Sequence, residues 1–215
     1  MYIAPHHEER DLAALQSLMQ AHPLGAWVTP GLGGLVANHI PFVLDKDRGE
    51  FGTLRAHVAR ANPVWRELPA AVPSLVIFQG PQSYITPSWY PGKQVDGKVV
   101  PTWNYVAVHA GGVASAIHDR DWIMQAITDL THQSESGRIE PWRITDAPRE
   151  YIEGLSRAIV GIEIPIASIS GKWKLSQDEA IADRVGTVAG LRAGGDANSL
   201  AMSRLVAERI EALAR

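Results

Sequence analysis

Short apolar segments separated by prolines and glycines dominate the first half of the chain. Eleven of the 14 prolines lie at or before Pro101. Apolar runs of strand length between such turn residues are typical of β-strands. Glycine pairs predict two hairpins, one at Gly33-Gly34 and one at Gly111-Gly112. We predict strands over residues 24–29, 35–40, 51–57, 74–79, 99–109, 113–118 and 162–169, the last interrupted by Pro165.

Helical periodicity appears between and after these strands. Apolar residues from Leu12 to Met19 share one helical face, and this helix is expected to end at His22-Pro23. Residues that commonly cap helices precede three further apolar stripes; they are Asp119, Asp146 and either Asn198 or Ser199. A strand-rich order with added helices, rather than strict strand–helix alternation, favours an α+β fold built on an antiparallel barrel.

Composition and charge exclude several classes of protein. The 215 residues carry 20 Lys plus Arg and 23 Asp plus Glu, a net charge of −3, which argues against strong non-specific nucleic-acid binding. The absence of cysteine excludes disulfides, thiolate metal sites and a cysteine nucleophile. No apolar run approaches the ~18–20 residues of a membrane span, and the polar N-terminus predicts no secretory signal. We therefore expect a cytoplasmic protein with no membrane partner.

Several familiar sites are also missing from the sequence. The glycines at positions 31–34 lead into a strand rather than a helix, so we interpret them as a turn and not as a phosphate-binding loop. The eight histidines show no zinc-type spacing, and His6-His7 is expected to be a solvated pair. We therefore predict no metal site.

Polar side chains gather in residues 52–65, GTLRAHVARANPVW. Strand alternation places Thr53, Arg55 and His57 on one side, and Arg60 and Asn62 follow at the strand end. A guanidinium and an imidazole at a strand end suit a phosphate, because guanidinium forms two parallel bonds to phosphate oxygens. The alternative is structural: Arg60 pairs with a carboxylate and His57 is a core histidine.

Aromatic and polar residues alternate in two further stretches, QGPQSYITPSWY at 79–90 and PTWNYVAVH at 101–109. Flat rings beside hydroxyl and amide groups suit a planar heteroaromatic ligand, although each ring alone fits a hydrophobic core equally well. A third stretch, GKWKLSQ at 171–177, is either a solvated turn or an arm that contacts an anion.

These stretches together with HIPFVLD at 39–45 and AIVGIEIPI at 158–166 resemble the PaiB-type family of FMN-binding negative transcriptional regulators. The resemblance runs from Tyr2 to about Leu191, and His7 departs from it because an aromatic residue is expected there. It implies a single split-barrel domain over residues 1–215, with 177–215 as a helical C-terminal extension. It also implies FMN as cofactor and a homodimer with the flavin in the subunit interface.

The resemblance further assigns twelve residues to the cofactor. Thr53, His57, Arg60 and Asn62 would contact the phosphate, and Asn38 and His39 lie on the strand beside the isoalloxazine. An arm carrying Lys172, Trp173 and Gln177 would reach the flavin of the other subunit. The remaining assignments are Ser88, Trp89 and Asn104.

Two functions follow from these observations. The family name implies a flavin-binding transcriptional regulator, with DNA as a possible partner through Arg204, Arg209 and Arg215; Glu208 and Glu211 interleave with them, as on an ordinary solvated helix face. The alternative is a flavin-dependent oxidoreductase, in which FMN carries the redox chemistry and His39 or Tyr105 is a candidate acid. Haem binding by a related barrel is a third possibility.

Overall fold

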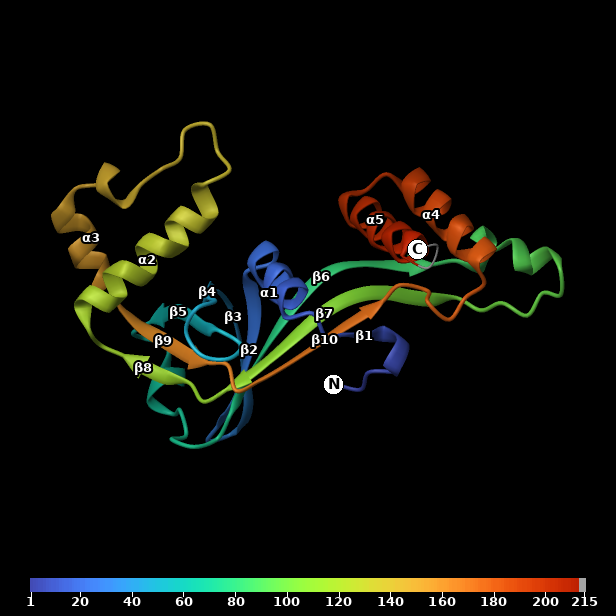
Figure 1. The fold of residues 1–215 in the computed structure, drawn as a ribbon. Coiled ribbons are helices and arrows are strands. Elements are labelled where there is room, and N and C mark those ends of the chain that lie inside the picture. Colours follow the sequence, from blue (N-terminus) through green and yellow to red (C-terminus); the bar gives the residue numbers. More distant parts are fainter. Residues whose placement is uncertain (213–215) are drawn as a thin grey trace. The chain divides into compact units, whose positions relative to one another are not determined.

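The structure, a computed structural model, describes residues 1–212 (Figure 1). The chain divides into two compact units. Unit 1 comprises Met1–Asp11, Gln79–Val108 and the chain from Ser170 onward, and unit 2 comprises Leu12–Phe78 and His109–Ile169. Residues 213–215, which the predicted C-terminal extension includes, lie outside the described part. The organisation as one domain remains a prediction.

The strands form two sheets, and every pairing given below is antiparallel. One sheet has six strands in the order β1-β10-β7-β6-β2-β3, and the other has four in the order β4-β5-β9-β8. The strands are β1 (Glu8–Glu9), β2 (Leu24–Gly31), β3 (Gly34–Pro41), β4 (Val43–Asp45), β5 (Thr53–Ala59), β6 (Ser74–Ile85), β7 (Thr102–Gly112), β8 (Ser115–Ile117), β9 (Ile159–Pro165) and β10 (Ser168–Lys174). Strands β6, β7 and β10 contribute residues to both units. Antiparallel sheets with added helices confirm the predicted α+β class.

The first predicted hairpin is confirmed in unit 2. Strands β2 and β3 pair antiparallel from Leu24↔Pro41 to Gly31↔Gly34. Gly34 has φ +121°, a conformation that residues with a Cβ rarely adopt, so glycine is required at this turn. The glycines therefore form a turn between strands, as the sequence predicts.

Strand β5 confirms the predicted alternation of its side chains. Leu54, Ala56 and Val58 are buried on one face, where they join the core of unit 2. Strand β9 lies beside β5 in the register Leu54↔Ile164 to Val58↔Val160, and its Ile162 and Ile164 are fully buried as well. Thr53, Arg55 and His57 therefore share the opposite face.

The second predicted hairpin is wrong. Gly111 and Gly112 continue β7 instead of forming a turn, and β8 pairs with β9 rather than with β7. A Cβ at Gly112 would overlap the carbonyl oxygen of Pro165, so this glycine permits a close approach of two backbones. The predicted strand at 162–169 is two strands, β9 and β10, which separate just after Pro165.

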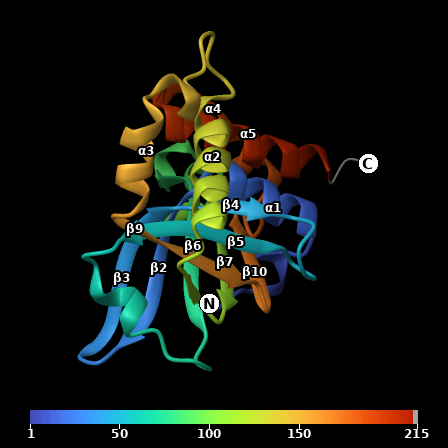
Figure 2. The same ribbon diagram turned by 90° about the vertical axis from the view of Figure 1, so that its left-hand side faces the viewer.

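Within residues 1–212, five α-helices and five short 3-10 helices complete the fold. The α-helices are α1 (Leu12–Ala21), α2 (Arg120–Glu135), α3 (Arg149–Ser156), α4 (Ile181–Gly194) and α5 (Ala197–Glu211). The 3-10 helices are η1 (Pro5–His7), η2 (Pro63–Arg66), η3 (Pro87–Trp89), η4 (Pro91–Gln94) and η5 (Ile144–Asp146). Within unit 2, α2 packs across β4 and β5 (Figure 2), and within unit 1, α4 and α5 lie side by side (Figure 1). Among the described residues, no helix combines the length and the apolar character that crossing a membrane requires.

The N-termini of the helices confirm one of the predicted capping residues and contradict the others. Asp119 caps α2 as predicted, because its Oδ1 accepts a hydrogen bond from the Trp122 backbone N–H at 2.7 Å. Asp146 instead lies in η5 and accepts from the Arg143 N–H, and α3 begins three residues later. Helix α5 is capped by Asp196 rather than by Asn198 or Ser199. The sequence interpretation did not resolve α4 as a separate helix, since its small residues give only a weak apolar stripe.

Candidate functional site

Arg60 is fixed at the end of β5 by carbonyl oxygens. Its Nε donates to the Arg157 carbonyl and its Nη2 to the Ile159 carbonyl, both at 2.8 Å. These bonds hold the guanidinium plane against the segment that leads into β9. The alternative in which Arg60 pairs with a carboxylate is therefore wrong, and its partners leave part of the guanidinium edge available.

A basic cavity of about 160 Å³ lies beside this guanidinium. It is at the first turn of α2, where the helix dipole favours an anion and where the Asp119 carboxylate already accepts from the Trp122 N–H. One carboxylate is close, because the Arg120 Nη2 lies 2.8 Å from the Glu153 Oε2. The lining combines three arginines and one histidine with one hydroxyl and one apolar side chain: Arg60, His118, Arg120, Ile123, Ser156 and Arg157.

The sequence identified only Arg60 in this cavity. Residues His118, Arg120 and Arg157 were not singled out, because they come from the start of α2 and the end of α3, about 60 to 100 positions along the chain. Their common feature is a basic side chain, which is frequent at protein surfaces and carries no spacing signal. Only the packing of α2 and α3 brings these side chains to the end of β5.

Asn62 and Asn38 are brought together next to this strand end. The Asn62 Nδ2 donates to the Asn38 Oδ1 at 2.8 Å, while the Asn62 Oδ1 caps η2 by accepting from the Val64 N–H. The Asn38 Nδ2 is buried and has no hydrogen-bond partner in the described part of the chain. A buried unpaired donor is costly, so this atom suits an acceptor on a bound ligand. His39 follows on β3 with its side chain exposed.

Thr53 and His57 occupy the predicted face of β5, but the structure gives them different surroundings. The Thr53 hydroxyl is buried and donates to the Arg48 carbonyl at 2.8 Å, so it closes the turn before β5. Arg55, between them, pairs with Asp129 of α2 at 2.8 Å. Burial lowers the pKa of His57, which disfavours the protonated ring as a partner for phosphate.

The lowered pKa predicts a dependence of stability on pH. Burial lowers the pKa of His57 and of His22 below the ordinary value of 6.5, so the unfolded chain binds more protons than the folded chain just below that pH. The free energy of unfolding is therefore expected to fall as the pH drops from 7 to 5. Urea unfolding at several pH values measures this, and His57→Gln should flatten the dependence. An unchanged slope in that variant would contradict the assignment to His57.

The six remaining candidate residues all belong to unit 1, and most of them have partners within it. The Asn104 Nδ2 donates to the Ser176 Oγ at 2.9 Å, and the Gln177 side chain bonds the backbone at Trp173 and Leu175. The Lys172 ammonium lies near the Tyr2 carbonyl and the Tyr105 ring. Trp173 is buried, Ser88 is exposed, and Trp89 packs against the glycines of α4.

One aromatic pair of unit 1 remains open to a ligand. Trp103 and Tyr84 are each 49% exposed and meet edge to face with 5.9 Å between ring centroids. The Trp103 Nε1 donates to the Gln82 Oε1 at 2.9 Å, which fixes the indole. These rings are therefore not core residues, unlike the buried Trp27.

Larger cavities lie along α2 and α3. One of about 520 Å³ is lined mainly by Met124, Ile144 and Ile152 and shares Arg120 with the basic cavity. None of the residues that the sequence singled out lines it. The basic cavity, which contains Arg60, therefore remains the candidate site.

Comparison with known proteins shows what this chain is related to. Residues 1–168 match the family described as "Putative FMN-binding domain". This chain belongs to that FMN-binding family. The match spans the whole of β5 and the basic cavity, and it supports FMN as the cofactor. The residues present fit FMN, because a cationic cavity and an unpaired buried amide donor complement its phosphate and its polar groups.

Relatives that align over nearly their whole length occur in fungi and bacteria. An uncharacterized protein of Emericella nidulans is 35% identical, with 98% of each chain covered. The protease synthase and sporulation protein PAI 2 of Bacillus subtilis is 29% identical, with 98% of this chain and 99% of that protein covered. The latter agrees with the PaiB-type resemblance.

Solved structures show the same fold at low sequence identity. The FAD and heme binding protein of Mycobacterium smegmatis is 19% identical with a TM-score of 0.60, covering 88% of this chain and 80% of that one. The flavocytochrome Anf3 of Azotobacter vinelandii is 15% identical with a TM-score of 0.58, covering 80% and 72%. At this identity the likeness concerns the fold alone.

Proposed function

We propose that this member of the FMN-binding family is a cytoplasmic, homodimeric split-barrel regulator of the PaiB type, and that it holds the FMN phosphate in the basic cavity at Arg60. The observation that carries the proposal is the cavity itself. It gathers three guanidinium groups and His118 at a helix N-terminus, within the residues that match the family.

The cavity suits the phosphate but not the whole cofactor. Whole-ligand pockets occupy roughly 300–1,000 Å³, and this cavity is about 160 Å³. The three-ring isoalloxazine must therefore lie outside it. Asn38 supports a position along β3, because its unpaired Nδ2 can donate to a ring carbonyl or nitrogen. When bound, FMN would supply two-electron redox chemistry, and the protein would supply orientation and charge.

Strand β3 supports the proposal of a homodimer. It is the last strand of its sheet, and both of its faces are largely exposed. Its apolar side chains include Leu35 at 80% exposed, and Leu32 in the adjoining turn is 93% exposed. Long apolar edge strands are usually covered by other chains or blocked by charge. A second copy related by two-fold symmetry would cover this strand and provide two equivalent FMN sites.

The DNA partner is less well supported by the structure. Of the cations predicted on α5, Arg209 pairs with Glu9 at 2.5 Å, and Arg215 lies outside the described residues. Of these three arginines, Arg204 alone lies within the described residues and has no ion pair there. We therefore propose the regulatory role without assigning α5 as a DNA-binding helix.

Titration with two flavins tests the phosphate site. FMN and riboflavin share the same ring and ribityl chain and differ only in the phosphate. Because a hydrogen bond to a charged group contributes roughly 1.5–3 kcal/mol, we expect FMN to bind at least about tenfold more tightly than riboflavin. Quenching of flavin fluorescence measures both dissociation constants. Equal affinities would overturn the phosphate assignment, and no binding of either flavin would overturn the proposed function.

Sedimentation velocity tests the dimer. Leu35→Lys places a charge on the exposed edge strand and is expected to convert a dimer into a monomer, since charged edges resist pairing. Val95→Lys is the matched control, because Val95 is equally exposed at 84% but lies in the segment after η4. A monomeric wild type, or a Leu35→Lys variant that stays dimeric, would contradict the role of β3.

A further inference from the structure

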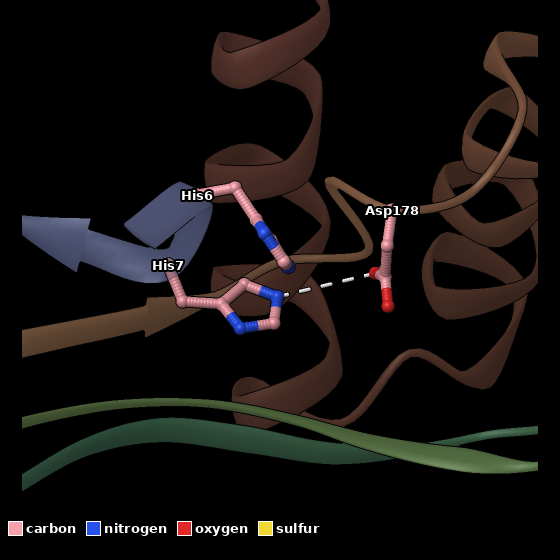
Figure 3. A group of neighbouring side chains, drawn as sticks. All are labelled: His6, His7 and Asp178. Carbon is pink, nitrogen blue, oxygen red and sulfur yellow. Dashed lines mark ion pairs between the residues drawn. The ribbon is translucent and has the colours of Figure 1, made fainter. Parts of the chain in front are cut away.

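Two histidines and one aspartate converge at the N-terminal end of unit 1. His6 and His7 lie in η1, and Asp178 lies in the turn between β10 and α4 (Figure 3). One ligand atom of each residue lies within 4.8 Å of those of the other two. The expectation of a solvated histidine pair is wrong for His7, which is only 5% exposed, although His6 is exposed.

The His7 Nε2 is the decisive atom. It is buried and has no hydrogen-bond partner among residues 1–212. It faces the Asp178 Oδ1 at 3.9 Å, as the dashed line in Figure 3 shows, which is too long for a hydrogen bond. Buried polar atoms nearly always have a partner, so an imidazole nitrogen in this position calls for a group that the protein itself does not provide.

We propose that His6, His7 and Asp178 bind a divalent first-row transition-metal ion of the Zn²⁺ class. Imidazole nitrogen and carboxylate oxygen are ligands that such ions take, and three protein ligands leave at least one coordination position for water. Cations such as Mg²⁺ favour oxygen ligands and are not expected here. This proposal is independent of the FMN site, which lies in unit 2.

The distances allow coordination after small movements. Bonds from Zn²⁺ to nitrogen and oxygen are about 2.0–2.2 Å, so ligand atoms around one ion lie roughly 3–3.5 Å apart. The buried His7 ring provides a fixed ligand. His6 is exposed and the Asp178 side chain is 54% exposed, so both can rotate toward the ion without disturbing the core.

The groups around the cluster hold the turn that carries Asp178 and include two lysines. The turn that carries Asp178 is closed by a hydrogen bond from the Glu179 N–H to the Ser176 carbonyl at 3.1 Å. The Lys172 ammonium donates to the Tyr2 carbonyl, and that of Lys174 donates to Thr102 and to the Trp103 carbonyl. Both ammonium groups bond neutral oxygens and keep their positive charge near His7, whereas Glu179 adds a second carboxylate to the turn.

Metal binding would join two segments of unit 1 that are far apart in sequence. His7 and Asp178 are separated by 171 positions, which explains why histidine spacing along the chain gave no sign of the site. An ion held by both segments would tie η1 to the turn before α4. Because a ligand that binds only the folded state stabilises it, the ion should raise the melting temperature of the protein.

Calorimetric titration of the untagged full-length protein with Zn²⁺ tests the site. We expect one Zn²⁺ per chain. His7→Phe, which keeps a ring at the buried position, should weaken binding at least about 100-fold, since removal of a ligand exceeds the 10–100-fold cost of losing a residue that only supports one. His132→Phe is the control, because His132 is exposed on α2 and outside the cluster, and it should bind like the wild type.

A second variant tests the metal site without changing a buried residue. Asp178→Asn changes an exposed side chain, so it should leave the fold intact while removing the rise in melting temperature that Zn²⁺ produces in the wild type. Mg²⁺ should produce no rise in either protein. The proposal is overturned if Zn²⁺ does not bind the wild type, or if the Asp178→Asn and His7→Phe variants bind it as tightly as the wild type does.

Discussion

Arg60→Ala is expected to weaken FMN binding by about 10- to 150-fold and to leave riboflavin binding far less affected. The lost guanidinium is a charge-assisted donor to phosphate, worth roughly 1.5–3 kcal/mol. The same side chain also holds the Arg157 and Ile159 carbonyls, so the variant should be somewhat less stable without any ligand. Affinity for FMN alone is therefore an insufficient measurement, and the ratio of FMN to riboflavin affinity is the informative one.

Arg66→Ala is the matched control for this experiment. Arg66 is an exposed arginine only six positions away, and its guanidinium stacks on the Trp65 ring at 4.5 Å. Removing it changes the net charge equally, so it reports any general electrostatic effect on an anionic ligand. If both variants lower the FMN-to-riboflavin ratio to the same degree, the phosphate does not lie at Arg60. If Arg60→Ala weakens both flavins equally, its role is structural.

Gly186→Ala is expected to destabilise the protein by about 2 kcal/mol or more. Alanine favours a helix over glycine by about 1 kcal/mol, so propensity alone predicts the opposite sign. A Cβ at Gly186 would, however, overlap the Trp89 carbonyl oxygen, a backbone atom that cannot rotate away. Overpacking typically costs 1–3 kcal/mol and sometimes more, and here the helix and the Trp89 segment must separate.

Gly154→Ala provides the comparison within the same chain. Gly154 is an exposed glycine in α3, and a Cβ there would meet no atom within 4 Å. It should therefore be stabilising by about 0.5–1 kcal/mol, through propensity alone. Thermal unfolding of both variants measures the contrast, at roughly 2–4 °C per kcal/mol for a chain of this size. Equal shifts of the same sign would contradict the packing of Trp89 on α4.

The contrast between these glycines shows which structural features can be predicted from the sequence and which cannot. Local conformation was accessible: the turn at Gly33-Gly34 and the cap at Asp119 depend on neighbours within four positions, and both are confirmed. The sequence at Gly111-Gly112 predicts another turn, but Gly112 permits a close approach to Pro165 and Gly111 one to Ser168, both more than 50 positions away. Glycine is therefore required for different reasons at different positions. Only the reasons that involve neighbouring residues in the sequence can be inferred from the sequence.

The candidate site also has features that the sequence predicts and features that it does not. Strand alternation placed Arg55 and His57 on one face of β5 and Arg60 at its end, because side chains on a strand point alternately to opposite sides. The sequence did not show that Arg60 bonds carbonyls, or that Arg120 and Arg157 stand beside it. Charged residues at a surface have no periodic signature, so their convergence depends on how α2 and α3 pack.

For this protein, the sequence by itself determined the α+β class, the β2–β3 hairpin, the polar face of β5 and membership of an FMN-binding family, because these follow from local periodicity and from extended motifs. The tertiary structure alone decided which strands pair across long separations, which cations surround Arg60, and that His7 is buried facing Asp178. Those features arise from contacts between residues far apart in the chain, and their energies depend on burial and distance rather than on residue type.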